Sequence, residues 1–250
     1  MTMNTLNAES EVVSLIHGLE DHSDYLKVNI DDFSDLALFI ADKNMEGFKE
    51  LLDDKIVNPK SFSSSLLNFT IHLAHKYQDK EYLKYFDLLL NYGAILHENA
   101  DGVIFSVIKW NESGMVFDHL IGAYNKQDEK NLKYSVITKM RLDEILVKRL
   151  MFSAITETNI QVLEILLKRY EDLFIRNLKE DSFVQNLVKA SQIGEHKYDS
   201  QLLSLLLSQS HTRQKLLIPN SPFISYLKKQ SKIKESNEDF VKRLEIYYAL

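Results

Sequence analysis

The chain has 250 residues, of which 45% are hydrophobic and 26% are charged, and it carries a net charge of −6. This composition is typical of a globular protein, and the absence of cysteine excludes disulfides, cysteine nucleophiles and iron–sulfur clusters. The acidic balance argues against a general nucleic-acid binder, because neutralising phosphates requires a basic face. Only 7 glycines and 3 prolines occur, which is too few for the many turns of an all-β protein. We therefore expect an all-α fold.

Charge is distributed unevenly along the chain. Residues 1–60 contain 13 acidic and 5 basic residues, whereas residues 201–250 contain 4 acidic and 8 basic ones. This distribution is typical of two solvent-exposed faces of opposite charge. The alternative is that the acidic N-terminal part of the chain docks a partner. The chain start lacks a basic segment followed by an apolar core, and apolar runs such as 36–41 reach only six residues. We expect neither a secretory signal nor a membrane span.

In chain order, residues 8–33 predict an amphipathic helix that would cap the N-terminal end of the fold. Five short apolar helices are then predicted, each with a small or β-branched residue at its sixth position: 35–41, 69–75, 102–108, 149–155 and 185–191. A polar turn and a second helix follow each of them, and the second helices contain Leu/Ile runs at 51–52, 88–90, 120–121, 165–167 and 205–207. The five units start 34, 33, 47 and 36 residues apart, and the longest spacing contains an insertion, 125–148, with a helical pattern of its own.

The last part of the chain predicts two further helices, around residues 223–232 and 239–250. Pro222 suits the first turn of a helix that starts after Ser221, and Asn237 suits the N-cap of the last helix. We expect these helices, within residues 213–250, to cap the C-terminal end of the fold.

The recurring helix–turn–helix unit of about 33 residues resembles the ankyrin repeat. The second unit carries the resemblance best, because Thr70-Ile71-His72-Leu73-Ala74 is similar to the Thr-Pro-Leu-His-x-Ala opening of that family. Its end, Leu88-Leu89-Leu90-Asn91-Tyr92-Gly93-Ala94, is similar to the family's Leu-Leu-Leu-x-x-Gly-Ala ending, where glycine favours the left-handed conformation at a helix end. Asn159 to Leu167 is similar to the family's second helix. The helix-start proline is absent from all five units.

This resemblance implies an ankyrin-like helical-repeat solenoid. Five degenerate repeats would occupy residues 34–212, between helical caps at 1–33 and 213–250, because a single helix pair cannot bury its apolar stripe alone. Another class of α-solenoid is the alternative for the outer units. The composition, rich in Lys, Asn, Ile, Leu and Tyr, also looks like that of ankyrin-type effectors of intracellular bacteria, and the segment from Lys232 to Glu245 resembles the polar C-terminal signals of some of them. That likeness implies a cytoplasmic location, in the bacterium or in a host cell.

Motifs of known catalytic chemistry are absent from the sequence. It contains no Gly-x-Ser-x-Gly, no His-Glu-x-x-His and no glycine-rich phosphate loop. His72 and His75 lie three residues apart on a predicted helix and could face one metal ion, but His72 occupies the repeat's own histidine position, which favours a structural role. We expect no enzyme, no cofactor and no metal. An enzyme of unidentified class, with its site in the insertion or the C-terminal helices, is the alternative.

A binding surface is predicted where the turns and the ends of the first helices would border a concave face. Trp110, the only tryptophan, and Tyr77 would be neighbours in adjacent units, and rigid aromatic side chains flanked by lysines are typical of interface hot spots. The alternative is that Trp110 and Tyr77 belong to the core. The predicted partner-binding residues are Lys76, Tyr77, His97, Glu98, Asn99, Asp101, Lys109, Trp110, Thr156 and Glu157.

The sequence therefore predicts a monomeric, non-catalytic module that recognises a folded protein partner through the concave face and binds no nucleic acid. A second alternative is a binder of nucleic acid or of a lipid surface that uses the basic residues near the C-terminal end. Those residues are Lys215, Lys228, Lys229, Lys232 and Lys234.

Overall fold

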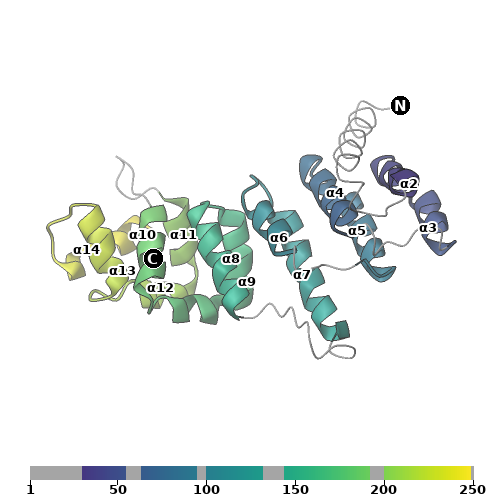
Figure 1. Ribbon diagram of the computed structural model, residues 1–250. Coiled ribbons are helices and arrows are strands. Elements are labelled where there is room, and N and C mark those ends of the chain that lie inside the picture. Colours follow the sequence, from purple (N-terminus) through teal and green to yellow (C-terminus); the bar gives the residue numbers. More distant parts are fainter. Residues whose placement is uncertain (1–29, 55–62, 95–99, 132–143, 192–199, 249–250) are drawn as a thin grey trace. The chain divides into compact units, whose positions relative to one another are not determined.

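A computed structural model of the protein describes residues 30–54, 63–94, 100–131, 144–191 and 200–248, and every regular element in these ranges is an α-helix (Figure 1). The all-α prediction is confirmed for this part of the chain. The helices are α2 (Ile30–Ala41), α3 (Met45–Asp53), α4 (Ser63–Lys76), α5 (Glu81–Asn91), α6 (Ala100–Ile108), α7 (Gly114–Asn131), α8 (Glu144–Thr156), α9 (Ile160–Asn177), α10 (Asp181–Ala190), α11 (Gln201–Ser208), α12 (Ser210–Leu216), α13 (Pro222–Gln230) and α14 (Asn237–Tyr247). None of these described helices is both long enough and apolar enough to span a bilayer.

The predicted apolar segments form helices in the order that the sequence indicates. The five short segments lie in α2, α4, α6, α8 and α10, with the last one ending in the turn after α10, and the Leu/Ile runs lie in α3, α5, α7, α9 and α11. The helix α9 illustrates why apolar spacing locates a helix: its apolar residues recur at helical spacing and form one buried face. The buried residues of that face include Val162, Leu163, Leu166 and Leu167.

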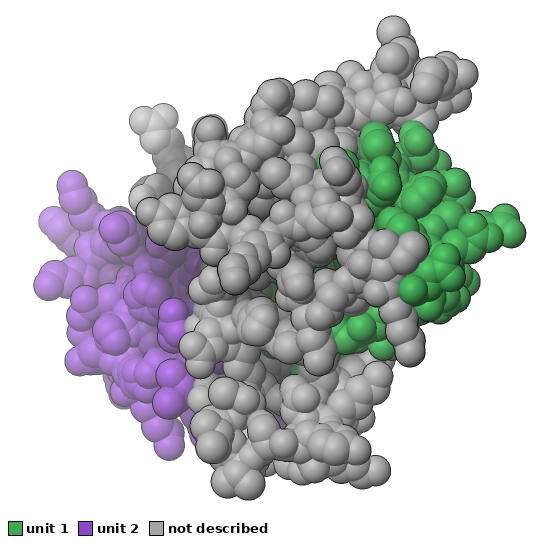
Figure 2. All heavy atoms as spheres, turned by 45° about the vertical axis from the view of Figure 1, so that its right-hand side comes forward, with its two compact units in different colours: residues 1–104, 119–130 green, residues 105–118, 131–250 purple. Residues whose placement is uncertain are grey.

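Two compact units make up the chain, and Figure 2 colours them separately. Unit 1 consists of residues 1–104 and 119–130, and unit 2 consists of residues 105–118 and 131–250. The division falls inside the helices α6 and α7.

In unit 1, helices pair and the first helices of two successive pairs pack against each other. The helix α2 packs on α3, α4 packs on α5, and α2 also packs on α4. The core contains Phe48 and Tyr85, both fully buried, whose rings meet edge to face at 5.1 Å. Polar bonds join the second helices: the Tyr92 hydroxyl at the end of α5 donates to Asp53 of α3, and His119 Nε2 of α7 lies 2.9 Å from Asp87 Oδ1 of α5.

In unit 2, the first helices of successive pairs stack in chain order. The helix α10 packs on α8 and α13 packs on α10, while α9 packs on α8 and α11 and α12 pack on α9. The last helix, α14, packs on α13. A polar bond again joins two second helices, since Arg169 of α9 binds Asp118 of α7 at 2.6 Å. The helix α12 is joined to α9 as well, because Thr212 Oγ1 donates to Glu171 at 3.0 Å.

Four of the turns between paired helices lie within the described residues. In each of these four, one residue adopts a positive φ without being glycine, with values from 48° to 56°, and these residues are Lys43, Gln78, Glu112 and Thr158. The next residue in three of the turns donates its backbone N–H to the carbonyl five residues earlier, as in Asp79 to Ala74 at 3.0 Å and Asn159 to Ala154 at 2.9 Å. This is the Schellman closure of a helix end. The predicted left-handed glycine, Gly93, closes α5 in the same way with a φ of 99°.

Of the local predictions at the starts of the last two helices, the one for α13 is confirmed and the one for α14 is wrong. Ser221 caps α13 and Pro222 is in its first turn, as predicted, but the cap of α14 is Ser236 rather than Asn237, which is already the first helical residue.

Two predicted segments fall only partly within the described residues. The N-terminal cap, 1–33, lies outside them except for the start of α2, and the centre of the insertion, 132–143, lies outside them as well. The flanks of the insertion are the last turns of α7 and the first turns of α8.

Candidate functional site

The turn that carries Trp110 is held by a single side chain from the next helix pair. Asn159, the N-cap of α9, donates its Nδ2 group to the carbonyls of Ile108 at 2.8 Å and Trp110 at 3.1 Å and to Ser113 Oγ at 3.0 Å. Its Oδ1 accepts from Val162 N at 3.1 Å, which is the usual N-cap bond. One amide therefore starts α9 and fixes the preceding turn.

Gln161 adds a second link between the same two segments. Its Oε1 accepts from the backbone N–H of Gly114 at 2.9 Å, at the start of α7. A Cβ at position 114 would lie 3.0 Å from both Cβ and Oε1 of Gln161, so glycine permits this close approach. This hydrogen bond orients the Gln161 side chain. Because Oε1 faces the Gly114 N–H, the Nε2 group points away from it.

A pocket of about 330 Å³ lies between the turn that carries Trp110 and the turn that joins α8 to α9, entirely within unit 2. The helix α11 contributes one side chain to its wall. The lining residues are Ile108, Lys109, Trp110, Asn111, Glu112, Glu157, Thr158, Asn159, Ile160, Gln161 and Gln201.

Amides, one indole and three charges dominate this pocket, which we call the turn pocket. Glu112 and Glu157 supply two carboxylates and Lys109 supplies one ammonium, so the lining carries a net charge of −1 at neutral pH. Lys109, Glu112 and Glu157 are exposed, and Trp110 is half-buried. The arrangement suits hydrogen bonding to a polar ligand around an aromatic surface.

Four of the predicted partner-binding residues belong to the neighbourhood of the turn pocket. Lys109, Trp110 and Glu157 line it. Thr156 is exposed beside it but takes part in packing between helices: its Oγ1 donates to the Phe152 carbonyl at 2.8 Å and accepts from Asn186 Nδ2 of α10 at 3.0 Å.

The predicted residues Lys76 and Tyr77 belong to a second cluster of turns, in unit 1. Lys76 Nζ lies 5.5 Å from the ring centroid of Tyr77, and the Tyr77 ring lies 5.9 Å from that of Tyr82. Among the described residues, the buried Tyr77 hydroxyl has no hydrogen-bond partner. Tyr77 is thus half-buried, with part of its ring packed against the turn. Its predicted pairing with Trp110 stays a prediction, since the two residues belong to different units.

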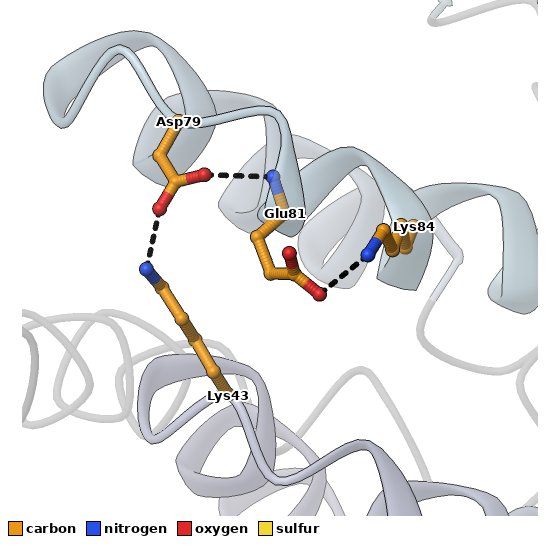
Figure 3. Close-up of polar contacts among 4 residues, drawn as sticks. All are labelled: Lys43, Asp79, Glu81 and Lys84. Carbon is orange, nitrogen blue, oxygen red and sulfur yellow. Dashed lines mark hydrogen bonds and ion pairs between the residues drawn. The ribbon is translucent and has the colours of Figure 1, made fainter.

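Charged side chains link the turns of unit 1 (Figure 3). Lys43 reaches from one turn to the carboxylate of Asp79 on the next, and the other Asp79 oxygen accepts from Glu81 N at 2.8 Å. Glu81 in turn pairs with Lys84 at 2.7 Å. The hydrogen bonds from Lys43 and from the Glu81 backbone hold the pKa of Asp79 below its ordinary value of 3.8. Lys43 Nζ also lies 4.9 Å from the ring centroid of Tyr82, whose pKa burial raises to about 12.

The remaining predicted site residues are outside the described part of the structure. His97, Glu98 and Asn99 precede α6, and Asp101 lies in the first turn of α6 without a described side chain.

Comparisons with protein-family models, with curated proteins and with solved structures find no match to this chain. Among the described residues, no group of three or more His, Asp or Glu side chains is arranged to hold a metal ion. Partial burial and the neighbouring His75 lower the pKa of His72 below 6.5, which disfavours a charged pair of histidines.

One of the basic residues considered for anionic ligands has internal partners. Lys228 Nζ donates to the Glu235 carbonyl at 2.6 Å and to Asn237 Oδ1 at 2.7 Å, so it joins the end of α13 to the start of α14. Its charge is used in packing the last two helices.

Sequence reasoning missed the amides that build the turn pocket. Asn159 carried a usable signal, since a polar residue directly before an amphipathic helix is typical of an N-cap. Gln161 and Gln201 carried none, because each reaches the pocket through tertiary packing from a different helix.

Proposed function

We propose that this protein is a monomeric, ankyrin-like helical-repeat protein that binds a protein partner along the edge formed by its turns, with the turn pocket as the principal contact. The bacterial or host cytoplasm as its place of action belongs to the same proposal. No catalytic step is part of it.

Packing within each unit supports the repeat architecture. First helices contact the next first helices in chain order, as α8, α10 and α13 do. The second helices α5 and α7 are joined by a side-chain bond between Asp87 and His119, which are 32 residues apart. Contacts limited to neighbours in the chain are the expected energetics of a repeat protein.

The observation that carries the binding proposal is the fixation of the Trp110 turn by Asn159. Three hydrogen bonds fix the backbone of this turn, and the half-buried side chain of Trp110 on it lines a polar pocket. A rigid aromatic anchor beside charged side chains loses little conformational entropy on binding, which is how interface hot spots are built.

A retention experiment tests the proposal. The full chain is immobilised, exposed to cytosolic extract, and compared with Trp110→Ala and Glu157→Lys by quantitative mass spectrometry. Because a hot-spot tryptophan contributes ~2 kcal/mol or more, at least one protein that the native chain retains should bind about 30-fold more weakly to Trp110→Ala.

Ile145→Ala provides the matched control, since Ile145 is a large apolar side chain on α8, 69% exposed and outside the turn pocket. It should retain the same proteins as the native chain. Equal retention by all variants, at unchanged melting temperature, contradicts a role of the turn pocket in partner binding.

A further inference from the structure

We infer that the turn pocket receives a cationic side chain, specifically the guanidinium of an arginine in an exposed segment of the partner. This inference rests on the proposed function and names the chemistry of the contact.

The charges of the pocket favour a cation. Glu112 and Glu157 come from two different turns and line the same pocket, whereas Lys109 is the single cation among its lining residues. A cation in the pocket is attracted by two carboxylates and repelled by one ammonium, whereas an anion is repelled by two groups and attracted by one. The two acidic residues also lie on turns whose backbone is fixed by Asn159 and by the Schellman closure after α8.

The aromatic surface distinguishes a guanidinium from other cations. Trp110 is the aromatic residue that lines the pocket, and indole is the aromatic group that binds cations best. A guanidinium is planar and weakly hydrated, so it can stack on an indole while its N–H groups reach a carboxylate. A lysine ammonium is a strongly hydrated point charge and loses more on entering such a site.

The amides of the pocket suit the peptide on both sides of such an arginine. Gln161 Oε1 accepts from Gly114 N, which leaves its Nε2 group as a donor. Gln201, exposed at the start of α11, offers both a donor and an acceptor. Backbone carbonyls and N–H groups of an extended segment are their natural partners.

Trp110 gives the test its readout, because the chain contains no other tryptophan. Fluorescence excited at the indole band is titrated with acetyl-Gly-Arg-Gly-amide and with the analogous lysine and glutamate peptides. The arginine peptide should change the emission saturably, the lysine peptide should bind more weakly, and the glutamate peptide should not saturate. Added salt should weaken the arginine complex.

Two charge-neutralising variants are expected to act in opposite directions. Glu157→Gln should weaken arginine binding about threefold, because it removes one exposed ion pair, and Lys109→Gln should strengthen it by a similar factor. Matched controls outside the pocket, Glu238→Gln on α14 and Lys189→Gln on α10, should leave the affinity unchanged.

Three outcomes overturn the inference. They are saturable binding of the glutamate peptide in preference to arginine, loss of binding in Lys109→Gln, or no saturable change with any peptide. In each case the retention experiment still decides the proposed function, because a partner held through Trp110 by other chemistry would be lost in Trp110→Ala.

Discussion

At the scale of single residues, an amide or carboxylate follows the left-handed residue in three of the four described turns, as Asn44, Asp79 and Asn159, and two of these side chains join neighbouring helix pairs. Asn159 caps α9 and binds the preceding turn, and Asp79 accepts both from the start of α5 and from Lys43 on the preceding turn. Asn44 occupies the same position, and its side chain accepts from Gly47 N at 3.0 Å. The residue at this position thus serves local capping and, at Asn159 and Asp79, also links neighbouring helix pairs.

Asn159→Asp separates these two roles. The carboxylate still accepts from Val162 N, but it cannot donate to the Ile108 and Trp110 carbonyls or to Ser113 Oγ. Leaving these acceptors without a donor should lower the free energy of unfolding by about 1–3 kcal/mol, as measured by urea titration. Asn44→Asp, which keeps its cap bond, should be neutral or slightly stabilising. Equal effects of the two substitutions would show that the Nδ2 bonds contribute nothing.

Tyr85 is fully buried, and its hydroxyl has no hydrogen-bond partner among the described residues. Tyr85→Phe keeps the edge-to-face contact with Phe48 and removes an unpaired buried polar group. We expect the free energy of unfolding to rise by about 1 kcal/mol. Tyr92→Phe, which removes the bond to Asp53, should lower it instead. A destabilised Tyr85→Phe protein would reveal a partner for the hydroxyl.

At the scale of elements, the sequence predicted the positions of the helices well and the backbone conformation of the turns that end them poorly. Apolar spacing located all five helix pairs because the burial of a helix face follows directly from its period, as in α9. The turns did not use the residues that their geometry prefers: Lys43, Gln78, Glu112 and Thr158 adopt the left-handed conformation that favours glycine. The helix α12 was missed because only Thr212 and Leu216 of its seven residues are buried.

Thr158 is the least suited of these residues, because a β-branched side chain is strained at a φ of 52°. Thr158→Gly and Thr158→Ala both remove the hydroxyl, but only glycine relieves the strain. The glycine variant should therefore be more stable than the alanine variant by about 1 kcal/mol in thermal unfolding. The reverse order of melting temperatures would mean that this turn does not store backbone strain.

The Lys43–Asp79 ion pair makes part of the stability of unit 1 depend on pH. Because the folded state holds the pKa of Asp79 below 3.8, the ionised carboxylate stabilises the fold above that pH, and the contribution is lost as pH falls through the lower, folded pKa. Both side chains are 35–40% exposed, so the pair contributes only ~0.5 kcal/mol. The stability difference between the native chain and Lys43→Gln should be constant from pH 7 to pH 5 and shrink below pH 3.8. A difference that grows in acid would contradict this assignment.

At the scale of the whole molecule, the order in which helices pack within each compact unit was predictable, and the turn pocket was only partly so. A helix-pair pattern that recurs about every 33 residues implies contacts between neighbouring helix pairs. Such contacts are found within each of the two compact units. Lys109, Trp110 and Glu157 could be placed at one edge from their position after a first helix. The pocket itself could not be predicted, because it needs Gln201 and the Asn159 bonds, which depend on how successive pairs are staggered.

Contacts limited to neighbours predict graded unfolding of unit 2. Phe240 is fully buried in the terminal helix α14, whereas Leu163 is fully buried in α9, which packs on several helices. In hydrogen exchange, Phe240→Ala should accelerate exchange mainly in α13 and α14, and Leu163→Ala should do so across α8 to α12. Uniform acceleration throughout unit 2 by both variants would indicate a single cooperative core instead.

The most direct measurement of the central claim is a hydrogen-exchange footprint of the full chain bound to a partner that it retains. Binding along the turns predicts slower exchange at residues 108–113 and 157–161, where the turn pocket is built, and no change on the exposed face of α8 that carries Ile145 and Phe152. Protection of that helix face with unchanged exchange at both turns would contradict the account.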